Sequence, residues 1–124
     1  MMKKLQRYNS DVCPFTYRVR LTLAKKKIRY ENIEIDLQNI PDDYYQISAA
    51  GKVPLIKHGE DIILESTILN EYLEDAFPGC PLLPASAVQR AKARLWIDYY
   101  NTAFQPNYCG LVFELDDKYR NLHR

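Results

Sequence analysis

Residues 4–26 read KLQRYNSDVCPFTYRVRLTLAKK, and they carry the clearest signals for a strand, a loop and a helix in this order. Residues 4–8 predict a short strand, and the polar residues 9–11 that follow are typical of a loop. Pro14 suits the first turn of a helix, where the N–H that proline lacks has no intrahelical acceptor. Apolar side chains then recur at helical spacing with cations toward the end, so we expect a helix over 14–26.

The residues that follow extend this unit into an α/β domain. Residues 28–35 are rich in Ile and Tyr and predict a second strand, parallel to the first because a helix connects them. Residues 41–45 begin a short helical turn. Two apolar runs, 53–57 and 62–64, flank a Gly-containing turn and predict a hairpin.

Three residues set the limits of the last elements of this domain. Pro54 must lie at the start of its strand, because a proline within a central strand loses a ladder hydrogen bond. Ser66 is expected to be the N-cap of a helix with one apolar stripe, which Pro78 ends. The first 78 residues therefore predict the order βαβαββα.

The rest of the chain predicts helices. Residues 86–89, SAVQ, form a capping box after a linker-like segment, and Pro106 should break or kink the helix near Thr102. We expect a domain over 1–80, a linker over 81–85 and the opening helices of an incomplete all-α domain over 86–124. One late stripe of apolar residues at helical spacing has no later element to cover it. We expect it to pack on the first domain or on another chain, unless the sequence is truncated. The stripe comprises Leu111, Val112, Leu115, Tyr119 and Leu122.

Composition and charge indicate a globular protein. The chain has 124 residues, 47% of them hydrophobic, and a net charge of +1, which favours neither nucleic acid nor an anionic membrane as a partner. Residues 1–30 nevertheless carry nine basic side chains and one acidic side chain. This basic stretch is either a solvated helix face or an anion-binding surface.

Targeting and metal signals are weak. No apolar segment follows the first basic residues as a secretory signal requires, and no run is long enough to span a membrane, so we expect a cytoplasmic protein. Three cysteines and two histidines without short repeated spacing argue against a disulfide framework and against a metal site.

Cys13 is the candidate nucleophile. It precedes Pro14 at the expected start of a helix, where unpaired N–H groups and the helix dipole favour a thiolate. The motif CPFT (13–16) places Thr16 where a redox C-x-x-C motif has its second cysteine, so a small thiol would have to resolve any adduct. The alternative is a buried cysteine that acts as a small hydrophobe.

Two further pairs could hold a ligand. If Pro54 follows a cis bond, the Val53 backbone can pair with an extended peptide. Ser66 at a helix start can bind a carboxylate, and Glu65 can accept from an ammonium, so together they could hold an amino-acid zwitterion. Taken singly, Pro54 could merely start a strand and Ser66 merely cap a helix.

These motifs, in this order, resemble one family. The segments CPFTYRVRL (13–21), GKVPL (51–55), ESTI (65–68), NEYL (70–73) and PLLP (81–84) are similar to the thioredoxin-like N-terminal domain of cysteine-type, omega-like glutathione transferases. The resemblance implies glutathione as cosubstrate, an unknown electrophile or disulfide as second substrate, and a homodimer.

The resemblance also implies roles for individual residues. Cys13 would be the catalytic thiol that forms a mixed disulfide with glutathione. Val53, before a cis Pro54, would pair with the cysteinyl backbone, and Glu65 and Ser66 would hold the γ-glutamyl group. The remaining members of the implied glutathione site are Phe15 and Lys52.

The sequence departs from the family pattern at three places. Ile40 stands where omega-class proteins have a lysine near the glycine carboxylate of glutathione, a role that Lys52 could partly take. Lys27 stands where a glycine usually follows the first helix, and would need a left-handed conformation or a different turn. The helical domain is much shorter than in the family, which indicates a fragment or a short member.

Other readings stay open. Tyr8 and Ser10 lie near positions where other transferases carry a catalytic hydroxyl, but both rank below Cys13, while Cys80 and Cys109 lack a helix-start context and are expected to be structural. The function is either glutathione-dependent thiol transfer or reduction at Cys13, or that of a non-catalytic interaction module resembling stringent starvation protein A.

Overall fold

The computed structural model describes residues 3–113, which divide into one unit ending at Leu82 and a second beginning at Leu83. The first unit has the predicted βαβαββα order, its middle helix being a short 3-10 helix. Its elements are β1 (Leu5–Asn9), α1 (Pro14–Lys25), β2 (Glu31–Glu34), η1 (Asp42–Gln46), β3 (Leu55–His58), β4 (Asp61–Leu64) and α2 (Ser66–Ala76).

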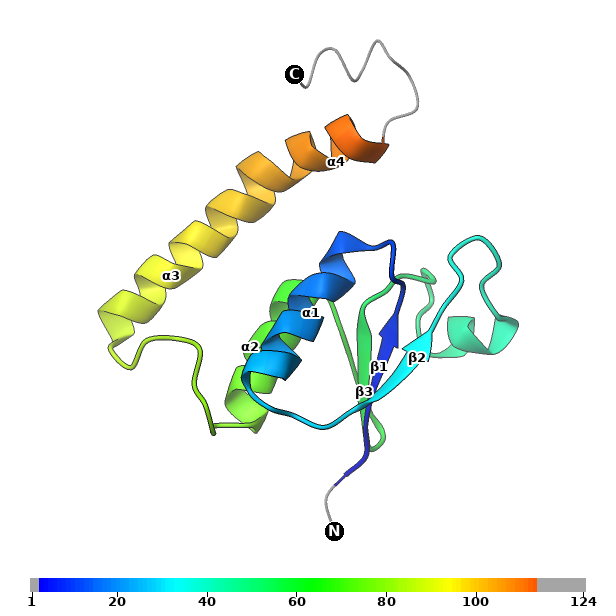
Figure 1. Cartoon of the computed structure of the whole chain (residues 1–124), viewed down its shortest axis with the longest axis horizontal. Helices are drawn as coiled ribbons and strands as arrows, with labels where there is room; N and C mark the ends of the chain where they lie inside the picture. The colour runs from blue at the N-terminus through cyan, green and yellow to red at the C-terminus, as the bar shows by residue number, and fades with distance from the viewer. Residues whose placement is uncertain (1–2, 114–124) are drawn as a thin grey trace. The chain divides into compact units, whose positions relative to one another are not determined.

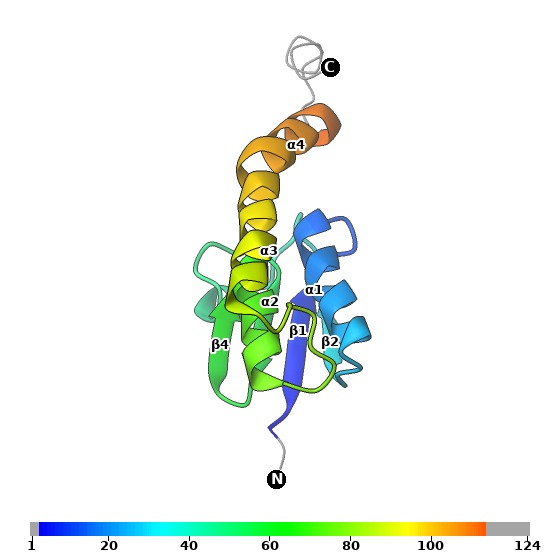
Figure 2. The same ribbon diagram turned by 90° about the vertical axis from the view of Figure 1, so that its left-hand side faces the viewer.

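The four strands form one mixed sheet in the order β2-β1-β3-β4. β1 pairs with β2 in parallel, as the intervening helix requires, and with β3 antiparallel, and β4 completes the predicted hairpin with β3. Helices α1 and α2 lie side by side on one face of the sheet, and η1 lies on the other side (Figures 1 and 2).

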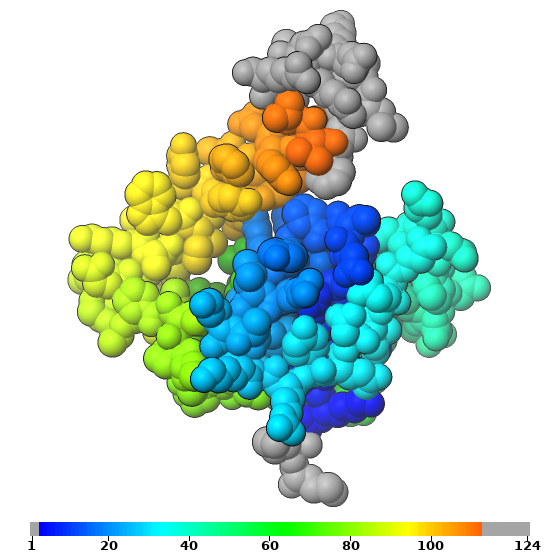
Figure 3. All heavy atoms as spheres, viewed as in Figure 1, coloured from blue at the N-terminus to red at the C-terminus, as the bar shows by residue number. Residues whose placement is uncertain are grey.

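Two apolar clusters hold the sheet between these layers. The larger lies between the sheet and the two helices, and the smaller between the sheet and η1. Figure 3 shows one face of this unit from outside, where the blue and cyan segments lie against one another. The buried residues of the larger cluster are Leu5, Val19, Leu23, Ile56, Leu69 and Leu73. Those of the smaller cluster are Ile35, Tyr44 and Val53, with Tyr8 and Cys13 packed against them.

Three local predictions are refined by the structure. β2 covers only 31–34 of the predicted 28–35, because Ile28 and Tyr30 pack against the larger cluster before the strand begins. Ser66 is the first helical residue and not the N-cap, which is Glu65 in a left-handed conformation with φ of 74°. Lys27 does adopt the left-handed conformation, with φ of 56°.

The described part of the second unit contains α3 (Ala87–Tyr99), the π-helix η2 (Tyr100–Phe104) and α4 (Gln105–Phe113). The predicted cap is confirmed, because the Ser86 hydroxyl accepts from the N–H of Gln89 at 3.1 Å. The helix is not broken before Pro106. It widens into one π-helical stretch, in which the Gln105 N–H bonds the Tyr100 carbonyl. This wider hydrogen-bond pattern lets the helix continue past Pro106, although proline has no N–H to donate.

Helix α3 buries none of its side chains. Leu111 and Val112 of the predicted stripe are also exposed, whereas Leu115, Tyr119 and Leu122 lie outside the described residues. Within residues 3–113, no helix has both the length and the apolar composition that crossing a membrane requires.

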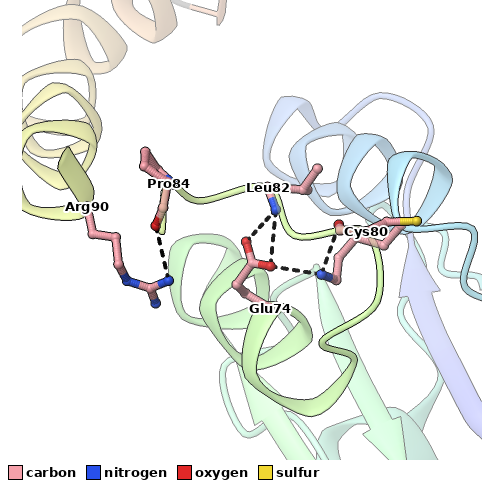
Figure 4. A network of polar contacts seen from close by, with 6 residues as sticks. Glu74, Cys80, Leu82, Pro84 and Arg90 are labelled. Carbon is pink, nitrogen blue, oxygen red and sulfur yellow. Dashed lines mark hydrogen bonds and ion pairs between the residues drawn. The ribbon is translucent and has the colours of Figure 1, made fainter. Parts of the chain in front are cut away.

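A buried ion pair joins the ends of α1 and α2 to the segment that follows them. Lys26 Nζ lies 2.8 Å from a carboxylate oxygen of Glu74, and the two side chains are 0% and 8% exposed. Lys26 also donates to the Cys80 carbonyl at 3.3 Å, and Glu74 accepts from the Leu82 N–H at 2.9 Å (Figure 4). These shared hydrogen bonds offset the cost of removing both charges from water. In the second unit, Arg90 donates to the Pro84 carbonyl (Figure 4).

Replacing Glu74 with Gln should leave the Lys26 ammonium buried without a counter-ion and lower the free energy of unfolding by about 3 kcal/mol. Urea denaturation measures this loss. Asp75→Asn, at the exposed neighbouring position, should change stability by less than about 0.5 kcal/mol. Equal effects of the two substitutions would contradict a specific role for the buried pair.

Candidate functional site

A cavity of about 370 Å³ lies where β1 ends and both α1 and α2 begin. All seven residues singled out from the sequence line it, although they come from three separate parts of the chain. Leu37, Gly51 and Leu64 complete the wall without having been predicted as site residues. The full lining is Cys13, Phe15, Leu37, Gly51, Lys52, Val53, Pro54, Leu64, Glu65 and Ser66.

Cys13 occupies the N-cap of α1, with Pro14 in the first turn as predicted. Its N–H bonds the Ser10 carbonyl at 3.1 Å, so the loop before the helix is closed. The buried Thr16 hydroxyl lies 3.0 Å from the Ser10 carbonyl and 2.9 Å from the Cys13 carbonyl, and so stabilises the same turn. The Cys13 thiol is free and half-buried, with Sγ 3.9 Å from the Val53 carbonyl oxygen.

The segment facing this thiol is held by its own hydrogen bonds. The Val53–Pro54 peptide is cis, as predicted. The Tyr44 hydroxyl donates to the Lys52 carbonyl at 2.7 Å, and the Ser48 hydroxyl lies 3.1 Å from the same oxygen. Gly51 has φ of +66°, and a Cβ there would meet the Tyr45 ring at 2.9 Å, so a larger residue would strain the backbone and displace that ring. The backbone opposite Cys13 is therefore preorganised.

The third wall is the start of α2. Ser66 is buried and Glu65 is exposed, so the carboxylate of Glu65 can reach a ligand in the cavity. Arg18, which the sequence analysis did not single out, lies 3.3 Å through Nη1 from the Ser66 hydroxyl and joins α1 to this wall. No local spacing indicates this contact, because it joins residues from two helices that are far apart in the sequence.

The cavity combines features suited to a thiol peptide with charged ends. The first residues of two helices line it, so N–H groups and the positive ends of two helix dipoles favour an anion there. Glu65 can accept from an ammonium and Lys52, also exposed, can meet a carboxylate. The described residues hold no group of three His, Cys, Asp or Glu side chains that could bind a metal ion.

The competing candidates do not line the cavity. Tyr8 packs in the smaller cluster with its ring 5.4 Å from that of Tyr44, and Ser10 is buried. Ile40 packs against the same cluster and does not line the cavity. Cys80 is exposed, so it does not have the buried structural role expected of it. Cys109 is half-buried, and its sulfur accepts a hydrogen bond from the Gln105 amide.

A mixed four-stranded sheet with two helices on one face, and a cysteine at the start of the first helix facing a cis-proline, defines a thioredoxin-like domain. The family model described as "Glutathione S-transferase, N-terminal domain" matches residues 8–81. The chain belongs to the glutathione S-transferase family, as an omega-like member.

Individual relatives agree with this assignment. "Glutathione S-transferase omega-2" of Rattus norvegicus is 39% identical over 94 residues, which cover 75% of this chain and 38% of the relative. A "Stringent starvation protein A homolog" of Haemophilus influenzae is 37% identical over 93 residues, covering 71% of this chain and 44% of that protein. The chain spans less than half the length of these two relatives.

Solved structures match nearly the whole chain. Glutathione transferase Omega 3C from Trametes versicolor superposes with a TM-score of 0.86 at 30% identity, covering 99% of this chain and 54% of that one. Rice GST1, solved in complex with glutathione, superposes with a TM-score of 0.85 at 31% identity, covering 99% and 57%.

Tyr44 provides a pH probe of the wall opposite Cys13. Burial raises the pKa of its phenol to about 12 from the usual 10.0. Between these values the unfolded chain releases the proton while the folded chain keeps it, so the free energy of unfolding falls as the pH rises through this window. Below it, the phenol is protonated in both states and contributes no slope.

Tyr44→Phe should therefore show a shallower loss of stability than the unchanged protein when urea midpoints are measured from about pH 9 to about pH 12. Tyr45→Phe, at the exposed neighbouring tyrosine, is the matched control and should keep the original slope. Parallel curves for the unchanged protein and Tyr44→Phe would show that burial of this phenol does not govern the alkaline transition.

Proposed function

We propose that the first unit binds glutathione in the Cys13 cavity and carries out glutathione-dependent thiol transfer or reduction. The observation that carries the proposal is that Cys13, at a helix start, shares one cavity with all six residues expected to hold glutathione. Membership of the glutathione S-transferase family and the glutathione complex of a solved relative support the choice of cosubstrate.

The proposed reaction has two balanced steps. The Cys13 thiolate attacks the glutathione sulfur of a mixed disulfide, a Cys13–S–SG bond forms, and the partner thiol leaves as a thiolate that takes up a proton. A second glutathione, as its thiolate, then attacks the glutathione sulfur of the adduct. Oxidised glutathione leaves and the Cys13 thiolate is restored. Thr16 cannot form a competing disulfide, so glutathione must resolve the adduct.

Each wall of the cavity receives one part of glutathione. The Val53 backbone pairs with the cysteinyl residue, whose sulfur then lies toward Cys13. Ser66 and the start of α2 bind the γ-glutamyl carboxylate, and Glu65 accepts from its ammonium. Lys52 meets the glycine carboxylate, and Phe15 closes the apolar side. Within this proposal, residues 1–80 form the glutathione-binding domain of a cytoplasmic homodimer.

Incubation with oxidised glutathione followed by intact-protein and peptide mass spectrometry tests the catalytic thiol. We expect one adduct on Cys13, removed by reduced glutathione, and none on Cys13→Ser. Cys80→Ser and Cys109→Ser are the matched controls and should label as the unchanged protein does. Labelling of Cys80 equal to that of Cys13 would contradict a selective site.

Ser66→Ala tests the carboxylate site separately from the chemistry. Loss of the hydroxyl should weaken glutathione binding by about ten- to a hundredfold, because a charge-assisted hydrogen bond contributes about 1.5–3 kcal/mol. Isothermal titration calorimetry with reduced glutathione measures the affinity. Ser86→Ala removes a serine at another helix start, outside the cavity, and should leave the affinity unchanged.

The second candidate function is a non-catalytic interaction module. It is favoured by the similarity to a stringent starvation protein A homolog. If glutathione neither binds nor labels Cys13 while the protein remains folded, this candidate replaces the enzyme.

A further inference from the structure

A second cavity, of about 760 Å³, lies at the other end of the first unit, where β1 begins and both α1 and α2 end. It shares no lining residue with the Cys13 cavity. Its volume lies within the range of pockets that hold small organic molecules, which is about 300–1,000 Å³. Neither the proposed thiol chemistry nor glutathione binding uses it.

Three aromatic rings form one wall of this cavity. The His58 ring stacks on Phe77 with the centroids 5.5 Å apart and the planes at 28°. Tyr72 meets His58 edge-on, and its hydroxyl lies 2.6 Å from His58 Nδ1, which fixes the orientation of both rings. All three side chains are half-buried, so each keeps exposed surface toward the cavity. This wall suits a flat ring.

The rim is basic. Lys3, Lys26, Lys27 and Arg29 line the cavity, and no acidic residue does. Lys26 is neutralised by Glu74, and Lys3 lies 3.2 Å from Asp61. Within residues 3–113, Lys27 and Arg29 form no ion pair, so the rim carries two uncommitted positive charges.

The backbone at Lys27 is a second, independent observation. This residue has φ of 56°, a conformation that disfavours every side chain relative to glycine. The turn holds it there, because the Lys27 N–H bonds the Ala24 carbonyl and the Ile28 N–H bonds the Leu23 carbonyl. A glycine would close the same turn without strain, so the lysine adds a cation to the rim at the expense of backbone stability.

We propose that this cavity binds a planar aromatic carboxylate. The ring packs against Phe77 and His58, and the carboxylate pairs with Lys27 and Arg29. The aromatic wall explains the preference for a flat ring, and the uncommitted cations explain the preference for an anion. The site is independent of the proposed glutathione site.

A titration of the full chain with 1-naphthoate, followed by amide NMR shifts, tests the location and the chemistry. We expect shifts at Ile28, Phe77 and Gly79 and none at Cys13 or Val53. The neutral 1-naphthamide and the non-aromatic cyclohexanecarboxylate should each bind at least about threefold more weakly, because one lacks the charge and the other the ring.

Lys27→Gly separates binding from stability. It removes the ammonium and supplies the residue that the left-handed turn favours, so 1-naphthoate should bind about three- to fivefold more weakly while the urea midpoint stays equal or rises. Arg29→Gln should weaken binding similarly. Lys25→Gln removes a neighbouring cation that does not line the cavity and should change nothing.

Three results would overturn the proposal. Shifts centred on Cys13 would place the ligand in the other cavity. Equal affinity for naphthoate and naphthamide would show that charge is not recognised. A loss of binding in Lys25→Gln as large as that in Lys27→Gly would show that the cations act only through the general charge of the helix end.

Discussion

The packing of α1 and α2 side by side on the same face of the sheet is the constraint on which the rest of this structure depends. Val19 and Leu23 of α1 and Leu69 and Leu73 of α2 are fully buried in the same cluster, which sets the two helices at one depth. Strands β1 and β4 run in the same direction because each is antiparallel to β3, so the helices that follow them both begin at one end of the unit and finish at the other. The buried pair of Lys26 and Glu74 secures the second of these ends.

This arrangement gives the two ends of the unit different chemistry. At one end, two helix N-termini line the cavity that holds Cys13, where N–H groups and helix dipoles favour a bound carboxylate. At the other end, the helices finish among lysines and an arginine beside an aromatic wall. An anion is favoured by backbone groups at the first end and by side-chain charges at the second.

Residue preferences within a few positions predicted most element boundaries. The predictions failed or were incomplete where packing or another hydrogen-bond pattern opposes such a preference. Pro14 after Cys13 marked the start of α1 because proline tolerates only the first turn. Ser66 was taken as an N-cap on propensity alone, but the left-handed Glu65 takes that place and Ser66 is turned inward toward Arg18. Pro106 was expected to break or kink the helix near Thr102, and the helix continues there through a π-helical stretch at Tyr100–Phe104. Packing and alternative hydrogen-bond patterns override propensity at such positions.

Proline, glycine and hydrophobic spacing act over a few residues, so the order of the elements and the helix start at Cys13 follow from local sequence. The residues themselves indicated Cys13, Val53, Pro54, Glu65 and Ser66 as members of the site, and the family resemblance added Phe15 and Lys52. Leu37, Gly51 and Leu64 join them only in the folded chain, which also sets the distance of 3.9 Å between the Cys13 sulfur and the Val53 carbonyl and the contact between Arg18 and Ser66. The basic stretch of residues 1–30 was also ambiguous in sequence. Its two uncommitted cations line a cavity only because distant residues, His58 and Phe77, fold against them.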